Sequence, residues 1–211
     1  MQETDCDIAI VGGGVIGLAC GLALQAEGRH VRVLEAGTAG CGSSHGNCGT
    51  ITPSHAAPLP APGTVARALR WMLTPDAPLY LPPRWDPALW AWLARFAARC
   101  NDRDWRQALT ARAAILSQAR ALLPDWIGRY GLDCEFEETG TDYVFRDAAD
   151  LDGFAHELGV LGEFGIASET IDGAAYARME PALRDGVAGV IRFPGDAHLR
   201  PRRPGLDPRG V

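Results

Sequence analysis

Residues 6–35 read CDIAIVGGGVIGLACGLALQAEGRHVRVLE, and this stretch decides the fold. The short apolar run Ile8–Val11 is typical of a buried parallel strand. The residues after it predict a glycine turn, a helix and a second strand over Val31–Leu34, which is closed by the acid Glu35. Strand, glycine turn, helix, strand and acid follow one another as they do in a dinucleotide-binding βαβ unit.

Three glycines occupy the turn in the spacing G-x-G-x-x-G: Gly12, Gly14 and Gly17. The first permits the tight turn, the second lets the backbone approach a pyrophosphate, and the third lets the helix pack closely on the strand. The first N–H groups of the helix would then bind the phosphates, and Glu35 would accept hydrogen bonds from ribose hydroxyls. A purely structural glycine turn is the alternative interpretation.

The composition indicates a folded, acidic protein of 211 residues, 47% apolar, with a formal net charge of −6. This charge opposes a general nucleic-acid binder. The uncharged run Ile8–Leu24 is glycine-rich and short for a membrane span, and Asp5 and Asp7 precede it where a signal peptide would carry positive charge. We therefore interpret the run as the strand and buried helix of the βαβ unit.

Six cysteines are spread along the chain, none of them in C-x-x-C spacing. This pattern predicts no metal site and favours a reduced, cytoplasmic compartment. Cys6 and Cys20 fall in the expected strand and helix, where we expect them to be buried as small hydrophobic residues. Cys41 and Cys48 lie in the loop after Glu35, where a redox pair is the less favoured interpretation.

A long loop of small residues follows Glu35, where an NAD-type domain would continue with a third strand. Ser43, Ser44 and Asn47 could hydrogen-bond an extended ligand there, and a flexible surface loop is the alternative. Beyond the loop we expect helices over residues 64–74, 86–99 and 102–130, with Asp86 as an N-cap and Pro124 kinking or dividing the third helix. Further along we expect a β-like pair over 134–140 and 141–147, a helix over 148–164, a short strand over 166–171, a short helix over 172–180 and a last strand over 187–193.

Five of the six tryptophans lie between residues 71 and 105, interleaved with arginines. We favour helices that pack on a sheet and keep their arginines in water. A docking or membrane-interface surface is the alternative.

With these motifs assembled, the chain resembles the D-amino-acid oxidase-like family of FAD-dependent oxidoreductases. Within it, the likeness is to the bacterial D-amino acid dehydrogenase small subunits, and it extends over residues 5–198. It rests on DIAIVGGGVIGLACGLAL, on GCGSSHGNCGTITP and on the block from APLPAPGTVARALRWML to LARFAARC. EETGTDYVFRD, RMEPAL and FPGDAHLRP add to it.

The resemblance implies an α/β fold: a Rossmann-like FAD-binding domain with an inserted α+β substrate domain. It makes FAD the expected cofactor rather than NAD. The residues that match the family's cofactor site lie in the glycine turn, at the acid and in the loop: Gly12, Gly13, Gly14, Val15, Ile16, Gly17, Glu35, Ala36, Ser43, Ser44, Gly46, Asn47 and Gly49. No catalytic residue is assigned. Three histidines invite assignment as catalytic bases, namely His45, His55 and His198, and His45 is the best candidate of the three because it lies in the cofactor loop. For Asp196 and His198, structural hydrogen bonding is the favoured role.

We expect the N-terminal part of the FAD-binding domain in residues 1–64, a helical block with a partial substrate-domain sheet in 65–195, and an irregular tail in 196–211. Family members are longer, and a C-terminal strand completes their FAD site. The tail reads RRPGLDPRGV, whose prolines oppose the helix that the family would show. A premature or frame-shifted end is therefore the expectation.

The implied reaction oxidises a D-amino acid at its α carbon by hydride transfer to flavin. The imino acid is then hydrolysed to a 2-oxo acid and ammonia, and a quinone or another acceptor takes the electrons. Two alternatives stay open: a glycine, sarcosine or proline-type amine oxidase, and a non-catalytic truncated remnant. The expected partner is a small amino acid or amine, and binding to nucleic acid is not expected. We expect a cytoplasmic protein, with peripheral contact with the inner face of the plasma membrane as an open option.

Overall fold

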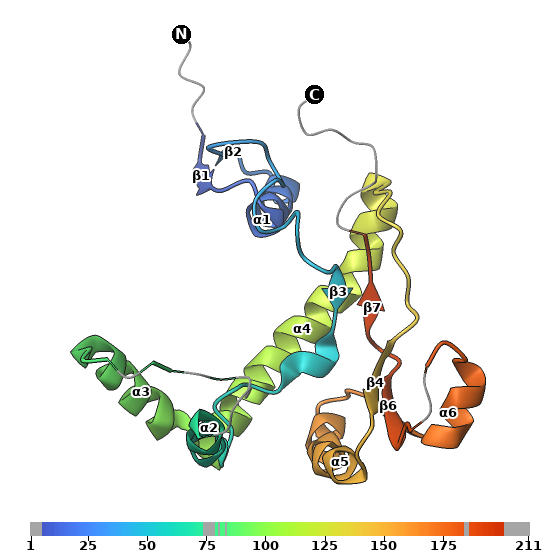
Figure 1. The fold of residues 1–211 in the computed structure, drawn as a ribbon. Helices are drawn as coiled ribbons and strands as arrows, with labels where there is room; N and C mark the ends of the chain where they lie inside the picture. The colour runs from blue at the N-terminus through green and yellow to red at the C-terminus, as the bar shows by residue number, and fades with distance from the viewer. Residues whose placement is uncertain (1–5, 74–78, 80, 83, 184–185, 201–211) are drawn as a thin grey trace. The chain divides into compact units, whose positions relative to one another are not determined.

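The computed structural model describes residues 6–73, 79, 81–82, 84–183 and 186–200, without the side chains of 156 and 157. The chain forms two compact units (Figure 1). Unit 1 gathers the described parts of Met1–Thr50, Asp133–Glu137 and His198–Val211, and unit 2 those of Ile51–Leu132 and Glu138–Ala197. The boundaries expected after residues 64 and 195 stay predictions, and the end of the expected tail, 201–211, lies outside the described residues.

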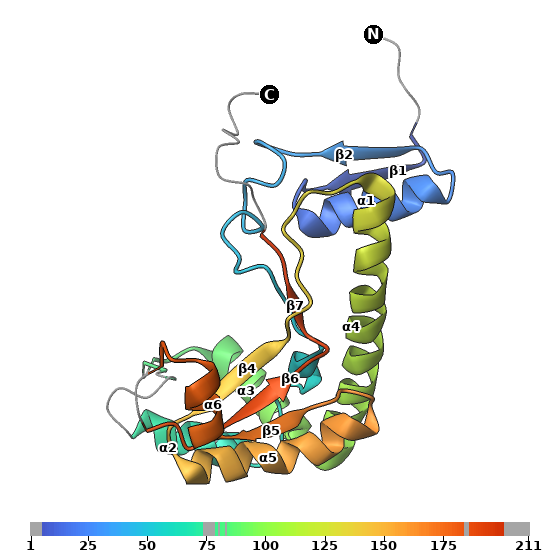
Figure 2. The ribbon, with the colours of Figure 1, turned by 90° about the vertical axis from the view of Figure 1, so that its right-hand side faces the viewer.

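Unit 1 contains the strand–turn–helix–strand order that the sequence predicts. Strands β1 (Ile8–Val11) and β2 (Val31–Leu34) pair in parallel, with Ile8 opposite Val31 and Val11 opposite Leu34. Helix α1 (Val15–Ala26) connects them and lies along one face of the pair (Figure 2). The prediction of a βαβ unit is therefore confirmed.

Two glycines bring α1 close to the strands. A Cβ atom on Gly17 would lie 2.0 Å from the carbonyl oxygen of Gly12, and one on Gly21 would lie 3.5 Å from a methyl group of Val33. Cys20 was expected to be buried, and this expectation is wrong: Cys20 is exposed. Because Gly17 and Gly21 form the helix face that meets the strands, a neighbouring position can point to solvent.

The segment 134–140 is not a strand of a hairpin, so this part of the expected β-like pair is wrong. Its backbone bonds instead to the end of the described chain: Glu137 and His198 exchange two hydrogen bonds of 2.9 and 3.0 Å. Glu135 has a φ of +47°, in the left-handed region, which interrupts extended backbone. A short strand, β3 (Thr50–Ile51), pairs with β7 (Ala197–His198).

Unit 2 is built on a three-stranded antiparallel sheet in the order β4–β6–β5. Its strands are β4 (Thr141–Phe145), β5 (Glu169–Asp172) and β6 (Gly189–Phe193), and Ile191 lies opposite both Tyr143 and Thr170. The helices are η1 (Pro53–Ala56), α2 (Thr64–Met72), α3 (Pro87–Arg99), α4 (Asp102–Tyr130), α5 (Ala148–Glu163) and α6 (Gly173–Met179).

Capping residues set the helix boundaries in unit 2. The Asp86 carboxylate accepts the N–H of Leu89 at 3.0 Å, which confirms the expected N-cap of α3. Helix α4 begins after the cap residue Asn101 and ends at Gly131, which has a φ of +60°. It runs through Pro124 without a break, so the helix is not divided there.

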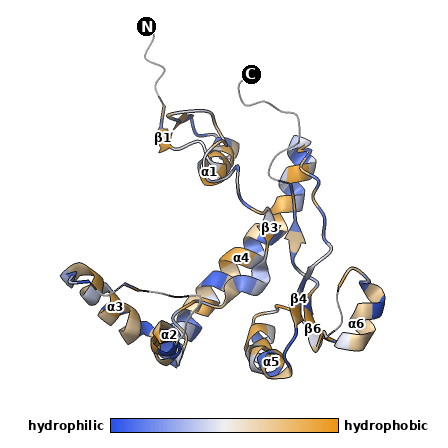
Figure 3. Ribbon diagram, in the orientation of Figure 1, coloured by the Kyte–Doolittle hydropathy of each residue, from blue (hydrophilic) through white to orange (hydrophobic). Residues whose placement is uncertain are grey.

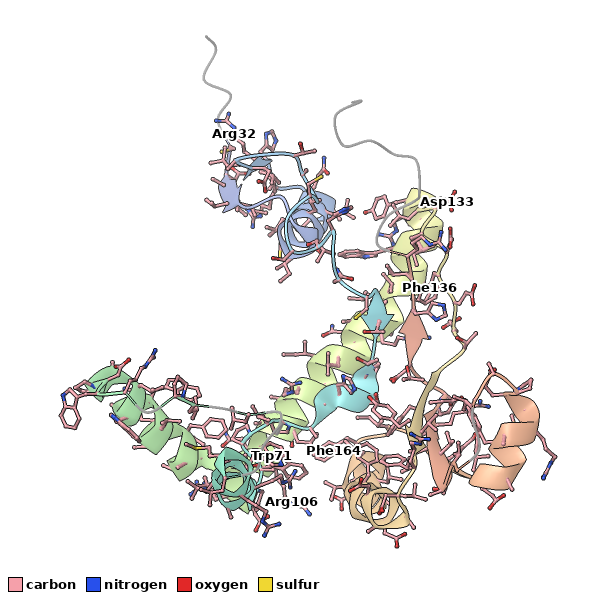
Figure 4. All side chains as sticks on the ribbon, in the orientation of Figure 1. Arg32, Trp71, Arg106, Asp133, Phe136 and Phe164 are labelled. Atoms are coloured by element: carbon pink, nitrogen blue, oxygen red, sulfur yellow. The ribbon has the colours of Figure 1, made fainter. Side chains whose placement is uncertain are left out.

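The core of unit 2 lies on one face of the sheet, beneath α4, α5 and η1. Its buried hydrophobic members are Ala56, Leu109, Ala113, Leu161, Ile166, Ile191 and Phe193. Hydrophilic and hydrophobic stretches alternate along α4, as Figure 3 shows, because only one side of this helix faces the core. On the surface, Arg106 of α4 pairs with Glu163 of α5 at 3.0 Å (Arg106 is labelled in Figure 4).

Candidate cofactor-binding site

The glycine turn of unit 1 is bent at Gly12. This residue has a φ of +104°, a conformation that residues with a side chain rarely adopt, and its N–H donates to the Leu34 carbonyl at 2.8 Å. The bond ties the turn to the end of β2. The start of α1 is therefore placed at the carboxyl ends of both parallel strands, where α/β sheets bind their ligands.

Glu35 is tied to the glycine turn by its side chain. One carboxylate oxygen accepts the N–H of Gly13 at 2.6 Å, and the other accepts the N–H of Gly37 at 3.0 Å. These bonds, that of Gly13 foremost, hold the pKa of Glu35 below its ordinary value. A carboxylate has about four acceptor positions, so Glu35 keeps capacity for ribose hydroxyls after both bonds are made.

Ser44 lies against the N-terminus of α1. Its hydroxyl oxygen accepts the N–H of Val15 at 2.9 Å, and a Cβ atom on Gly14 would lie 3.1 Å from it. Within the described part of the chain, the N–H groups of Gly14, Ile16 and Gly17 have no hydrogen-bond acceptor. Free N–H groups at the positive end of a helix fit a phosphate group.

Further hydrogen bonds order the loop that carries Ser44. The Asn47 side chain donates to the Ser44 carbonyl at 2.9 Å and accepts the N–H of Gly49 at 2.7 Å. The N–H of Gly40 donates to the carbonyl of Gly13 at 2.8 Å. The structure thus brings the turn, Glu35, Ser44 and the Asn47 loop together in one unit.

The other candidates from the sequence contribute less in this geometry. Ser43 and Gly46 are exposed and make no hydrogen bond to the turn among the residues described. Ala36 follows Glu35, and its backbone N–H helps to lower the pKa of that carboxyl group. Sequence reasoning missed Gly37 and Gly40, which bond to Glu35 and Gly13. The sequence feature that could have identified these two glycines is the run of small residues directly after Glu35.

The thiols of the loop are free. Cys41 and Cys48 are exposed, and all six cysteines are unpaired in the structure. The Thr50 hydroxyl, 3.8 Å from the Cys48 sulfur, lowers the pKa of that thiol by hydrogen bonding. Within the described residues, no three His, Cys, Asp or Glu side chains gather as a metal site would require.

Unit 2 holds a polar cluster around η1. Asp196 is 1% exposed, and its carboxylate accepts the backbone N–H of Ser54 at 3.1 Å and the Ser54 hydroxyl at 2.6 Å. The Tyr143 hydroxyl is hydrogen-bonded to the Nε2 atom of His55. Burial, above all, raises the pKa of Tyr143.

The remaining histidine candidates lie in unit 1. His198 is exposed, with Nε2 3.7 Å from the Glu137 carboxylate, and the N–H of His45 donates to the Gly42 carbonyl at 3.0 Å.

The model of one protein family matches residues 7–203, nearly the whole chain, and its description is "FAD dependent oxidoreductase". The chain belongs to this family. The resemblance seen in the sequence is thereby confirmed, and so is the mixed α/β fold class. FAD is the cofactor on which the family depends.

The chain is similar to curated bacterial proteins named D-amino acid dehydrogenase. It is 34% identical to that of Methylobacterium nodulans over 93% of this chain and 48% of the relative. It is 35% identical to that of Methylobacterium radiotolerans over 93% of this chain and 49% of the relative. The chain therefore spans about half the length of the curated relatives it matches.

Solved structures share the fold at lower identity. Glycine oxidase from Geobacillus kaustophilus matches with a TM-score of 0.61 at 22% identity, over 92% of this chain and 40% of its own. L-proline dehydrogenase from P. horikoshii matches with a TM-score of 0.57 at 18% identity, over 93% of this chain and 38% of its own. These likenesses establish the fold.

Proposed function

We propose that this chain supplies the FAD-binding turn and part of the substrate unit of an oxidoreductase that oxidises D-amino acids at the α carbon. The observation that carries the proposal is the group of free N–H donors at the start of α1, bordered by Glu35 and Ser44. The identity of 34–35% with D-amino acid dehydrogenases over most of the chain supports the substrate class.

Different residues of the candidate site would bind different parts of FAD. The N–H groups of Gly14, Ile16 and Gly17 would bind the pyrophosphate, and the remaining acceptor positions of Glu35 would bind the ribose. Ser43 and Ser44 would lie beside the phosphates and the ribityl chain, and residues 46–49 along the flavin. When bound, FAD would supply the hydride acceptor, and the protein would orient the substrate and exclude water.

Unit 2 would contribute to substrate binding. The sheet β4–β6–β5 supports the proposal that residues 65–195 carry part of a substrate domain. The product would be an imino acid, which water hydrolyses to a 2-oxo acid and ammonia.

We further propose a quinone-type electron acceptor and peripheral contact of α3 with the inner face of the plasma membrane. Trp90 and Trp92 on α3 are each 54% exposed, and arginines at 95 and 99 are also exposed on this helix, which supports contact with an anionic surface. No helix in the described part of the chain has the length and apolar character needed to cross a bilayer.

The test is reduction of the loaded protein by candidate substrates. The full chain is purified in the presence of FAD, made anaerobic and mixed separately with D-alanine, glycine, sarcosine and L-proline. We expect bleaching of the flavin absorbance by D-alanine and not by the other three. Bleaching by glycine, sarcosine or proline alone would favour an amine oxidase. A protein that takes up no FAD would refute the proposal and favour a non-catalytic remnant.

A further inference from the structure

The first turn of α1 is capped by a side chain from the loop that follows Glu35. The N-cap residue Gly14 has no side chain that could accept a helix N–H, and no acidic residue lies in the first turn. The hydroxyl oxygen of Ser44, 29 positions after Val15, accepts the Val15 N–H at 2.9 Å instead. Ser44 therefore replaces the local cap that Ser, Thr, Asp or Asn normally supplies at the N-cap position.

The Ser44 hydroxyl keeps its proton for a ligand. A serine hydroxyl has one proton and two acceptor lone pairs, and Val15 uses only a lone pair. Among the residues that the structure describes, none accepts a hydrogen bond from this hydroxyl. An oxygen that accepts from an N–H group is polarised and becomes a stronger donor. A carboxylate at this position would also cap α1, but it would offer no proton and would repel a phosphate.

The side chain of Asn47 connects Ser44 to a buried part of unit 1. Its Nδ2 group donates to the Ser44 carbonyl at 2.9 Å, and its Oδ1 atom accepts the N–H of Gly49 at 2.7 Å. Gly49 is buried, and its carbonyl accepts the N–H of Leu199 at 2.9 Å. The exposed amide of Asn47 thus ties the Ser44 backbone to a position that is itself bonded to a distant segment of the same unit.

The bond between Ser44 and Val15 is too weak to hold the loop at α1 by itself. Ordering the backbone of one loop residue costs about 1–2 kcal/mol, whereas one hydrogen bond contributes about 0.5–1.5 kcal/mol. The two hydrogen bonds of the Asn47 amide supply the difference. Because both ends of this amide are bonded within the loop, the geometry favours a positioning role over contact between the amide and a ligand.

We propose that Asn47 is a positioning residue for FAD. It holds the Ser44 hydroxyl where this group caps α1 and donates its proton to a phosphate oxygen. This inference rests on the proposed function. Ser44 then adds a further donor to the free N–H groups of Gly14, Ile16 and Gly17. The donor set belongs to the folded loop, so it is formed before FAD binds.

The first experiment tests the link from Asn47 to Val15 without FAD, by amide hydrogen exchange measured with NMR on the full chain. Val15 has Ser44 as its acceptor, whereas the neighbouring Ile16 has none among the described residues and is the internal reference. After correction for intrinsic rates, we expect Val15 to exchange about tenfold more slowly than Ile16 in the wild type, as one hydrogen bond allows. Asn47→Ala and Ser44→Ala should each remove this difference. Retained protection of Val15 in Asn47→Ala would overturn the proposal, and so would equal exchange of the two amides in the wild type.

The second experiment measures FAD affinity by fluorescence titration in a double-mutant cycle. Ser44→Ala should weaken binding about tenfold, and Asn47→Ala about five- to tenfold. If Asn47 acts through Ser44, the double variant should also lose about tenfold, rather than the product of the two losses. Gln25→Ala is the matched control, because it truncates another exposed amide of unit 1 and should bind FAD as the wild type does.

Losses that multiply in the double variant would overturn the proposal, because they would mark Asn47 as an independent contact or as a residue that only stabilises the fold. Wild-type affinity in Asn47→Ala would overturn it as well. If the wild type binds no FAD, the proposed function fails and the role of Asn47 toward FAD falls with it. The exchange data then still establish or refute the link from Asn47 to Ser44.

Discussion

Replacing Gly17 by alanine would force α1 away from the glycine turn. The new Cβ would lie 2.0 Å from the Gly12 carbonyl oxygen, and real Cβ contacts essentially never fall below 3.0 Å, so helix and turn must separate by about 1 Å. The obstacle is backbone, which cannot rotate aside as a side chain can. We expect a loss of about 1–3 kcal/mol in the free energy of unfolding, as for other overpacked sites.

The same displacement moves the N–H donors of α1 away from a phosphate. An error of this size costs on the order of 10- to 100-fold, and we expect FAD affinity to fall by that factor. Urea unfolding followed by circular dichroism measures the first effect, and a titration of FAD fluorescence measures the second. Gly128→Ala in α4 is the control, because its Cβ would meet nothing within 4 Å, and it should raise stability by about 0.5–1 kcal/mol. Wild-type stability and FAD affinity in Gly17→Ala would refute the close approach.

Three further outcomes are expected. Arg192 holds the pKa of Asp142 below its ordinary value, so their bond stabilises the fold above a pH of about 4 and is lost as the pH falls through the lowered pKa. Asp142→Asn should therefore cost about 1–3 kcal/mol at pH 7 in urea unfolding and less at pH 3, and an equal cost at both would contradict the ion pair. Ser44→Ala should weaken FAD binding about tenfold in the fluorescence titration while leaving circular dichroism unchanged; unaltered affinity would separate Ser44 from the site. Sedimentation with anionic vesicles should fall when Trp90 and Trp92 are both replaced by alanine, whereas equal sedimentation would count against contact through α3.

Local patterns in the sequence were enough to predict the glycine turn of the βαβ unit and the capped helices. The glycine spacing and Glu35 lie within one βαβ unit, where each residue acts on near neighbours, so spacing alone places them. Asp86 likewise caps a helix that begins at the next residue.

Contacts between distant segments could not be predicted in this way. The residues at 134–137 bond to the chain at 198–200, and the expected β-like pair fails because β4 pairs with β6 instead. Asp196 and Ser54 are hydrogen-bonded although they lie 142 positions apart in the sequence. No sequence motif around either residue predicts this contact. Their two hydrogen bonds arise only because the folded chain brings η1 beside the turn that follows β6.

The central claim is that the turn at the start of α1, with Glu35 and Ser44, binds FAD. The most direct measurement is the visible spectrum of the purified full chain after incubation with FAD and removal of unbound ligand. The account predicts a stoichiometric flavin spectrum that Gly17→Ala diminishes and Gly128→Ala does not. A folded, colourless wild-type protein would contradict it.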